Sequence, residues 1–479
     1  MVLVAGVDSS TQSTKVAVVD TDDGRIVGLG RGSHAVEGTG GARVTDPEVW
    51  ARALGEALAS TGCAGRVSAV SVAAQQHGLV ALDRDRRAVA PAILWNDTRS
   101  APDAARLVAD LGGPQACAAR VGSVLTAAFT VSSWAWLRRS RPEVARRAAT
   151  VCLPHDYLAS LLTGRSPSTD RSDASGTGWW SPADDDYADD VLSLPAVGLD
   201  RERLPAVLGP AEPAGEVSAD AAERFGLPRG ALVGPGAGDN AAAALGLGLA
   251  PGELCVSLGT SGTAFSVSAA PCAEPTGVVA GFASADGRFL PLACTLNATL
   301  AVDSAAALLG LDRDDVAVSS GEVVFLPWLD GERTPDLPGA SGALAGLRHG
   351  TDRRAVLLAA YEGAAWTLAV ALERVAEQSG AGPGPLVLVG GGSRGRTWQD
   401  ALGRVTGRSL VVPHSSELVA LGAALQAAAV AEQVAPAEIA GRWRTREGEV
   451  VDAVARDEQL CGRLAGWGAA ASGYFARGG

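Results

Sequence analysis

The fold is decided by the stretch VLVAGVDSSTQSTKVAVV (residues 2–19). Its first six residues predict a buried strand, residues 8–14 predict a polar turn, and residues 15–19 predict a second strand. The turn carries an Asp at the end of the first strand, followed by several hydroxyls. Backbone N–H groups and Ser or Thr hydroxyls can donate to phosphate oxygens, so the turn suits a nucleotide phosphate. An ordinary hairpin with a polar loop is the alternative interpretation of this stretch alone.

The same pattern returns in the second half of the chain as ELCVSLGTSGTAFSV (residues 253–267). Residues 253–258 predict a strand, residues 259–262 a tight turn with hydroxyls, and residues 263–267 a returning strand. Two such units, separated by the length of a domain, are much stronger evidence for a nucleotide-phosphate site than one unit alone. They predict two similar α/β domains that face each other across a nucleotide, each supplying one phosphate-binding turn.

Length and composition agree with two domains and exclude several classes of protein. The chain has 479 residues, more than one core comfortably organises, and is 47% hydrophobic and 19% charged, which is typical of a folded protein. A net charge of −13 argues against nonspecific binding to nucleic acid or an anionic membrane. The seven cysteines are never in CxxC spacing, so neither a zinc site nor a disulfide framework is indicated. We find no signal-peptide pattern or membrane-length apolar run, and expect a cytoplasmic protein.

The midpoint of the chain carries the sequence GAGDNAAAALG (residues 236–246), in which one acid, Asp239, lies between small residues. Small residues before it let the backbone approach a ligand closely, and the alanines after it predict the start of a tightly packed helix. Two interpretations are open from this stretch alone. Asp239 is either the N-cap of that helix or a carboxylate aimed at a ligand.

Polar side chains also follow a predicted strand in the first half. The buried strand at residues 67–72 runs into QQHG (residues 75–78), and the end of a strand is the usual place for ligand groups in an α/β sheet. A lone His77 is more often structural, but the neighbouring glutamines favour contact with a sugar or polyol, since amides and imidazole pair well with hydroxyls. LWNDTR (residues 94–99) mixes an aromatic ring with hydrogen-bonding groups. That mixture suits a sugar site or a capped helix start with a buried Trp.

Two further segments stand out in the second half. The segment FLPWLDGERTP (residues 325–335) predicts a loop of fixed shape, which Glu332 and Arg333 are expected to brace. A predicted strand at residues 385–389 ends in GGGS (residues 390–393) before a helical pattern. Glycines there allow a flat ligand such as an adenine ring to lie against the backbone, although such a turn alone is common.

Taken together, the motifs resemble the FGGY family of carbohydrate kinases, and within it most closely the xylulokinases. The resemblance spans nearly the whole chain and keeps the motifs in the family's order. They are GVDSST (6–11), QQHG (75–78), LWNDTR (94–99), LPHDY (153–157), GDNA (238–241), SLGTSG (257–262), GERTP (331–335) and GGGS (390–393). The resemblance implies two ribonuclease-H-like domains of the actin and hexokinase type, residues 1–235 and 236–479, with the last helix packing back on the first domain.

The implied reaction transfers the γ-phosphoryl group of ATP to the C5 hydroxyl of D-xylulose, with Mg²⁺. By resemblance, Asp239 is the catalytic base, Asp8 assists it by holding the metal, and both carboxylates are expected metal ligands. The expected sugar contacts are Gln76, His77, Trp95, Asn96, Asp239 and Asn240. The expected ATP contacts are Ser10, Thr11, Lys15, Thr260, Ser261, Gly391, Gly392 and Ser393. The expected partners are therefore the sugar and ATP, with no nucleic acid or membrane, and a homodimer is common in the family.

The chain departs from the family pattern at four positions. Ser10 replaces a usual Gly and Gln76 a common Met, while Ser133 and His155 stand where related xylulokinases have Lys. Two other functions stay open. One is an FGGY kinase for ribulose, gluconate, glycerol or another ketose. The other is a non-kinase ATPase like actin or the heat-shock chaperones, which would share the phosphate turns without needing the sugar-type residues.

Overall fold

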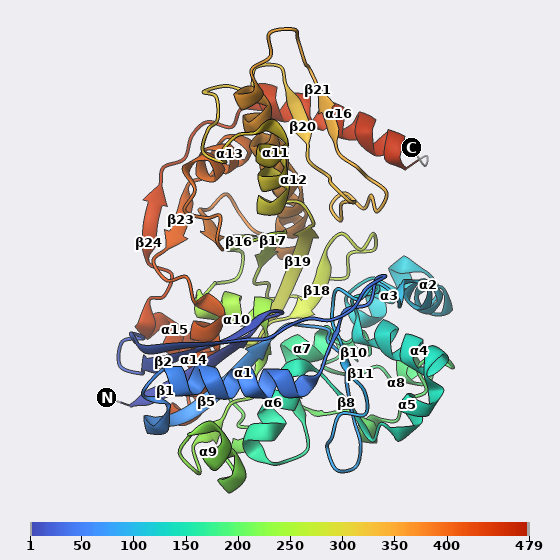
Figure 1. Ribbon diagram of the computed structural model, residues 1–479, viewed down its shortest axis with the longest axis vertical. Helices are drawn as coiled ribbons and strands as arrows, with labels where there is room; N and C mark the ends of the chain where they lie inside the picture. The colour runs from blue at the N-terminus through green and yellow to red at the C-terminus, as the bar shows by residue number, and fades with distance from the viewer. Residues whose placement is uncertain (1, 477–479) are drawn as a thin grey trace.

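Two seven-stranded sheets organise the computed structural model, which describes residues 2–476 (Figure 1). The first sheet has the order β13-β14-β5-β1-β2-β3, with β15 also paired to β5, and the second has the order β18-β19-β17-β16-β22-β23-β24. The strands of the first sheet are β1 (Leu3–Ser9), β2 (Ser13–Asp20), β3 (Ile26–Ser33), β5 (Val67–Ala74), β13 (Gly215–Glu216), β14 (Leu232–Val233) and β15 (Ala237–Gly238). Those of the second are β16 (Leu254–Leu258), β17 (Gly262–Ser266), β18 (Ala280–Ala283), β19 (Phe289–Thr295), β22 (Leu386–Val389), β23 (Leu410–Pro413) and β24 (Gly448–Val451).

Both predicted strand–turn–strand units are present, one in each sheet. β1 and β2 form an antiparallel hairpin, as do β16 and β17. In each unit the first strand also pairs in parallel with a later strand, β1 with β5 and β16 with β22. The two sheets therefore share a local plan, and the prediction of a repeated α/β architecture is confirmed.

Helices cover the faces of both sheets. α1 (Pro47–Ser60) packs on β2 and β3, and Asp46 caps it by accepting from the Glu48 N–H, as the Asp-Pro-Glu sequence favours. α12 (Arg353–Ser379) is long and apolar enough to cross a membrane, but 83% of its most apolar window is buried inside the fold. It is the central helix of the second core, which it shares with β17, β19 and β20 (Val324–Leu326).

The remaining elements are shorter. The helices are α2 (Ala101–Asp110), α3 (Pro114–Val121), α4 (Thr130–Ser140), α5 (Pro142–Arg147), α6 (Pro154–Thr163), α7 (Arg171–Ser175), α8 (Asp189–Leu192), α9 (Ala219–Phe225), α10 (Asp239–Gly246), α11 (Thr299–Leu309), α13 (Arg396–Thr406), α14 (Leu418–Glu432), α15 (Pro436–Trp443) and α16 (Glu458–Phe475). The small two-stranded sheets pair β4 (Val44–Thr45) with β7 (Ala92–Ile93), β6 (Val80–Leu82) with β8 (Thr150–Cys152), β9 (Ser168–Asp170) with β12 (Ala206–Leu208), β10 (Trp180–Ser181) with β11 (Asp186–Tyr187), and β20 with β21 (Ala343–Ala345).

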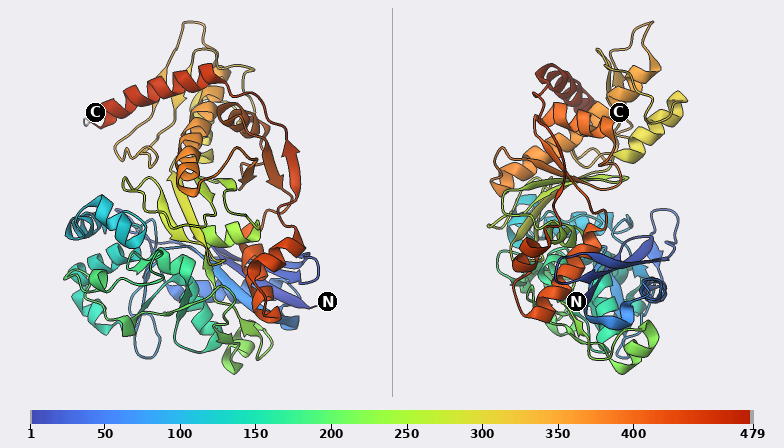
Figure 2. Two further views of the ribbon diagram at one scale, coloured as in Figure 1. Left: turned by 180° about the vertical axis from the view of Figure 1, so that it is seen from behind. Right: turned by 90° about the vertical axis from the view of Figure 1, so that its left-hand side faces the viewer.

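A late segment of the chain returns to the first sheet. α14 follows β23 of the second sheet in sequence, yet it packs on β1, β2 and β5 and against α10 (Figures 1 and 2). The chain then goes back to the second sheet as β24. The last helix, α16, packs instead against α12, α13 and β20. The helix that packs back on the first domain is thus α14, whereas the sequence resemblance assigned that position to the last helix.

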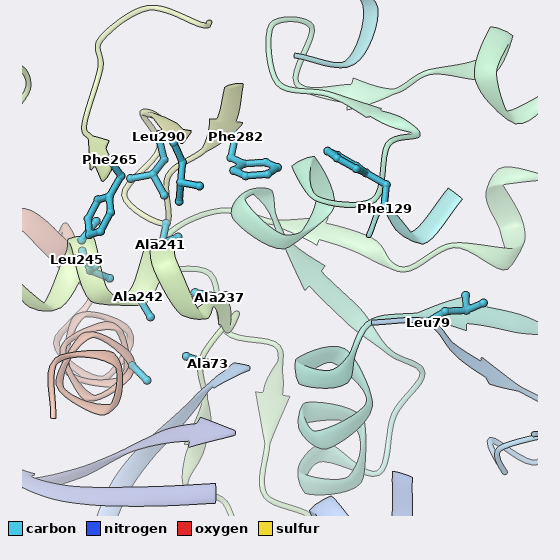
Figure 3. Close-up of a cluster of buried hydrophobic side chains, with 14 of the residues drawn as sticks. Ala73, Leu79, Phe129, Ala237, Ala241, Ala242, Leu245, Phe265, Phe282 and Leu290 are labelled. Carbon is cyan, nitrogen blue, oxygen red and sulfur yellow. The ribbon is translucent and has the colours of Figure 1, made fainter. Parts of the chain in front are cut away.

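Glycines allow α14 to approach its neighbours backbone to backbone. A Cβ added at Gly6 of β1 would lie 1.9 Å from the Ala420 carbonyl oxygen of α14. One added at Gly422 of α14 would lie 1.9 Å from the Ala242 carbonyl oxygen of α10. Small residues from this junction, including Ala242, share one buried cluster with Phe265 of the second sheet (Figure 3). α14 therefore packs directly between β1 and α10, and neither glycine position has room for a larger side chain.

We predict that Gly422→Ala lowers the free energy of unfolding by about 1–3 kcal/mol, because the new methyl group would displace the backbone of α10. Urea denaturation of the whole chain measures this. Gly441→Ala is the matched control, because Gly441 lies inside α15 and a Cβ there meets no atom within 4 Å. That control should be neutral or stabilising by up to about 1 kcal/mol. Equal stability of Gly422→Ala and the parent would contradict the packing described.

Candidate functional site

Three parallel strands of the first sheet end at one edge. Asp8 of β1 is in register with Ala73 of β5, and Ala73 is in register with Ala237 of β15. The carboxyl ends of parallel strands meet at the same edge of a sheet, where ligands commonly bind. The structure therefore brings together the first turn, the QQHG segment (residues 75–78) and Asp239, which directly follow these strands.

Asp239 is the first residue of α10 rather than its cap. The N-cap position is held by Gly238, which has extended backbone angles (φ −67°, ψ 149°) because it still belongs to β15. The Asp239 Oδ1 atom accepts hydrogen bonds from the backbone N–H of Asn240 at 2.8 Å and from its side-chain Nδ2 at 3.0 Å. The N-cap interpretation of Asp239 is therefore wrong.

The carboxylates of Asp8 and Asp239 lie close enough to affect each other. Burial and, second, the charge of Asp8 together raise the pKa of Asp239 to about 7. Burial also raises the pKa of Asp8, against the hydrogen bond that Ser10 Oγ donates to it at 2.6 Å and the charge of Lys15. The Lys15 Nζ atom contacts Glu417 Oε2 at 2.8 Å. Two neighbouring carboxylates are oxygen ligands of the kind Mg²⁺ prefers, so this pair fits the ion.

His77 is held in a neutral form at the same edge. Its Nδ1 donates to the Gly176 carbonyl oxygen at 2.5 Å, and burial lowers the pKa of the ring to about 4. The Nε2 atom is then a hydrogen-bond acceptor. The ring centroid lies 4.9 Å from that of Phe129 and 5.5 Å from that of Phe282, which belongs to β18 of the second sheet. His77 also has a φ of 67°, a conformation that non-glycine residues rarely adopt without a local constraint.

The two glutamines before His77 have different surroundings. Gln76 is 5% exposed, and its Nε2 donates to the Ser172 carbonyl oxygen at 3.1 Å, so the amide nitrogen anchors α7. Both amide atoms of Gln75 are buried, and neither has a hydrogen-bond partner among residues 2–476. An unpaired buried amide is costly, so water or a ligand is the expected partner. The sequence pattern pointed to both glutamines, but the sugar contacts expected from the family resemblance include Gln76 and not Gln75.

The LWNDTR segment adjoins the first turn. The Trp95 Nε1 atom donates to Thr11 Oγ1 at 3.2 Å, and the Trp95 ring is 41% exposed. The Oδ1 atom of Asn96 is buried and has no partner within the described part of the chain. Asp97 and Arg99 form an ion pair at 2.7 Å that fixes the segment. Trp95 therefore offers an open ring face beside the first phosphate turn.

The second turn and the GGGS segment meet in the other sheet. The Gly392 N–H donates to the Leu258 carbonyl oxygen at 3.0 Å, which places residues 390–393 beside the turn at residues 259–261. The first turn of α11 packs on the same turn, since the Leu300 N–H donates to the Thr260 carbonyl oxygen at 3.3 Å. The predicted ATP contacts Thr260, Ser261 and Gly391 are exposed, whereas Gly392 and Ser393 are buried.

His155, one of the departures from the family pattern, is buried beneath the strand that leads to Asp239. A Cβ added at Gly236, where φ is 87°, would lie 2.2 Å from the His155 ring. The Nδ1 atom contacts Asp173 Oδ2 at 2.5 Å, and Nε2 lies 3.1 Å from Asp156 Oδ1. Burial opposes a charge on the ring, but these two carboxylates outweigh it and raise the pKa of His155 to about 10. His155 is therefore a buried cation, as a Lys would be. Ser133 is buried in α4.

The GERTP loop reaches the site from the second sheet. Thr334 Oγ1 donates to the Cys294 carbonyl oxygen of β19 at 2.7 Å. Glu332 accepts three hydrogen bonds from its own domain, so its predicted bracing role agrees with the structure. Arg333 does not brace the loop through an ion pair. After burial, the charge of Arg333 is a further cause that lowers the pKa of His77, an effect that the expected bracing role did not include.

Comparison with known proteins identifies the class of protein to which the chain belongs. Residues 3–246 match the N-terminal domain of the FGGY family of carbohydrate kinases, and residues 254–431 match its C-terminal domain. The chain belongs to the FGGY family of carbohydrate kinases, which are ATP-dependent sugar kinases. The fold predicted from the sequence, two α/β domains of the ribonuclease-H-like actin and hexokinase type, is confirmed.

The chain is also similar to individual kinases over nearly its whole length. The chain is 53% identical over 467 residues to a xylulose kinase of Streptomyces coelicolor and 52% identical over 467 residues to a xylulose kinase of Streptomyces rubiginosus. Each alignment covers 97% of this chain and 95% of the relative. The crystal structure of xylulose kinase from Bifidobacterium adolescentis is 34% identical and superposes with a TM-score of 0.83, covering 97% of this chain and 99% of that one.

We predict that neither His77 nor His155 titrates between about pH 5 and 8, the range in which an ordinary histidine changes charge. His77 should stay neutral because burial lowers its pKa to about 4, and His155 should stay protonated because its acidic neighbours raise its pKa to about 10. Carbon-13 NMR of histidine-labelled protein measures both, with His77→Asn and His155→Gln to assign the signals. A midpoint near pH 6.5 for either ring would contradict its described surroundings.

Proposed function

We propose that the protein transfers the γ-phosphoryl group of ATP to the C5 hydroxyl of D-xylulose in the cytoplasm, giving D-xylulose 5-phosphate and ADP. The choice of xylulose as the substrate rests on the 53% identity to a xylulose kinase over 97% of the chain. The site supports the chemistry, because a carboxylate, a neutral imidazole and a phosphate-type turn lie at one edge of the first sheet, and the second sheet has a turn of the same kind.

Asp239 acts as the general base in this proposal. Its carboxylate accepts the proton of the attacking C5 hydroxyl, and the two hydrogen bonds from Asn240 hold one of its oxygens in a fixed direction. His77 presents Nε2 as an acceptor for a sugar hydroxyl. Trp95 offers its exposed ring face to the sugar, while the unpaired Asn96 Oδ1 and the Gln76 amide supply further polar contacts.

The proposed ATP site is divided between the two sheets. Hydroxyls and backbone N–H groups of the first turn (Ser10, Thr11) and the second turn (Thr260, Ser261) donate to phosphate oxygens, with Lys15 beside the first turn. The adenosine lies against Gly391, Gly392 and Ser393. Asp8 and Asp239 would hold Mg²⁺, which neutralises charge on the phosphates when bound. Closure of the two domains, with the boundary near residue 235, excludes water that would otherwise take the place of the sugar.

A substrate panel tests the proposed function. Coupled ADP release should show the highest kcat/KM with D-xylulose when ribulose, gluconate, glycerol and other ketoses are compared. A higher value with another of these compounds would assign a different substrate to the same site. Sugar-independent ATP consumption would favour the alternative of an actin-like or chaperone-like ATPase. Light scattering after size exclusion tests the homodimer that we also propose.

We predict that Asp239→Ala lowers kcat by about 10²–10⁴, the usual contribution of a general base, while ATP binding changes little. Coupled ADP release and calorimetry with ATP measure the two effects. Asp220→Ala is a suitable control, because Asp220 is an exposed acid in the first turn of α9, away from the site. An active Asp239→Ala variant would remove Asp239 from the mechanism.

We also predict that kcat/KM for xylulose falls as the pH is lowered through about 7. The base works only when ionised, and burial together with Asp8 raises the pKa of Asp239 to about 7 in the free enzyme. The rate should therefore be high above this pH and decline below it, with one proton taken up. Rates measured with saturating ATP across the pH range provide the profile. A decline centred near pH 4 would show that Asp239 titrates like an exposed carboxyl.

A further inference from the structure

The GERTP loop uses its acid to hold itself in place, not to pair with its arginine. Glu332 is 1% exposed. Its Oε1 accepts from the Leu296 N–H at 2.6 Å and the Arg333 N–H at 2.7 Å, and its Oε2 accepts from Asn297 Nδ2 at 3.0 Å. The carboxylate is thus engaged by backbone and amide groups, which leaves the Arg333 guanidinium without this neighbour as a partner.

Both flanks of Arg333 are tied to the end of β19. Asn297 Nδ2 donates to the Gly331 carbonyl oxygen at 2.8 Å, and Asn297 Oδ1 accepts from the Leu329 N–H at 3.1 Å. On the other side, Thr334 Oγ1 donates to the Cys294 carbonyl oxygen. The backbone of Arg333 is therefore fixed to the second sheet at the point where that sheet faces the first.

The residue after Arg333 is anchored where the two sheets pack together, because Thr334 donates to Cys294, and Cys294 packs against the hydrophobic cluster that contains Ala237 and Phe282. After burial, which is the larger cause of both shifts, the charge of Arg333 lowers the pKa of His77 and of Cys294, and the charge of Asp239 raises the pKa of Cys294. Phe282 of β18, the strand next to β19 in the sheet, contacts the His77 ring. Arg333, whose side chain is half-buried, therefore belongs to a loop anchored on β19, and the neighbouring strand β18 contacts the proposed sugar contact His77.

Half-buried arginines of the described chain mostly have polar partners: Arg99, Arg171 and Arg404 contact acids. Others, among them Arg43, Arg138, Arg203 and Arg408, donate to carbonyl oxygens. Arg333 has neither kind of partner, a property that it shares with Arg463. Within residues 2–476 the guanidinium of Arg333 makes no ion pair or hydrogen bond. A partly desolvated cation without a counter-charge is costly unless a ligand supplies one.

The proposed reaction brings an anion to this place. The phosphoryl group must lie beside the oxygen that Asp239 deprotonates, where two carboxylates repel it. Lys15, on the first-sheet side, is already paired with Glu417. A guanidinium approaching from the second domain offers two parallel N–H groups, whose geometry matches a pair of phosphoryl oxygens better than a lysine does.

We propose that Arg333 is a catalytic residue that donates hydrogen bonds to the non-bridging oxygens of the phosphoryl group during transfer, and then to the phosphate of the product. This rests on the proposed kinase reaction. The bond between the γ-phosphorus and the ADP oxygen breaks, a bond from phosphorus to the C5 oxygen forms, and the C5 proton passes to Asp239. Arg333 neither gains nor loses a proton.

The test compares Arg333→Ala with the parent in the full chain. We expect kcat to fall by about 10²–10³, as when one preorganised transition-state donor is removed, while KM for xylulose changes less than about threefold. Calorimetry should show D-xylulose 5-phosphate binding at least about tenfold more weakly and D-xylulose binding unchanged. Added guanidinium ion at low millimolar concentration should restore part of the lost kcat, which a misfolded variant would not allow. Arg333→Gln is a second uncharged variant if Arg333→Ala does not fold.

Arg348→Met is the matched control, because Arg348 is an exposed arginine of the same domain, after β21. It should leave kcat, KM and product binding unchanged. An unchanged kcat in both Arg333 variants would overturn the proposal. A raised KM for xylulose at full kcat would also overturn it, by making Arg333 a sugar contact. If the parent instead uses another sugar, the proposed substrate fails, and the same measurements with that sugar still decide the role of Arg333.

Discussion

The structure depends on the close packing of α14 between β1 and α10. Side chains larger than hydrogen at Gly6 and Gly422 would collide with backbone atoms, so the three elements are fixed relative to one another by steric exclusion. α10 begins at Asp239, and β1 ends near Asp8. The two carboxylates of the site are therefore carried by elements that pack on the same helix.

Charge at the site is arranged by domain. The edge of the first sheet carries the acids Asp8 and Asp239, and the cations near it are neutralised, Lys15 by Glu417 and the buried His155 by Asp173. The second domain presents an unpaired cation on the GERTP loop. This arrangement gives the two sides of the proposed site opposite charges, so an anionic group between them would meet repulsion on one side and attraction on the other.

Much of this could be read from the sequence, for identifiable reasons. The strand–turn–strand units follow from local apolar patterns, and Asp239 was found because small residues isolate it. Three features depended on contacts that no local pattern encodes. Gly238 pairs with β5 and so displaces the helix start to Asp239. The apolar pattern of α14 does not say which sheet it covers. Glu332 and Arg333 are adjacent in the GERTP loop, and this suggested that the two side chains brace the loop together. The Glu332 carboxylate instead accepts hydrogen bonds from amide and N–H groups.

The return of α14 has a consequence for how the chain acquires its structure during synthesis. The first sheet is encoded by residues 3–238, yet the face of β1 and β5 that α14 covers stays open until residue 432 has been made. A nascent N-terminal half is therefore an incomplete folding unit with an exposed apolar sheet face, and is open to aggregation until the later helix arrives. The N-terminal domain is synthesised first, but it completes its fold only after α14 has been made.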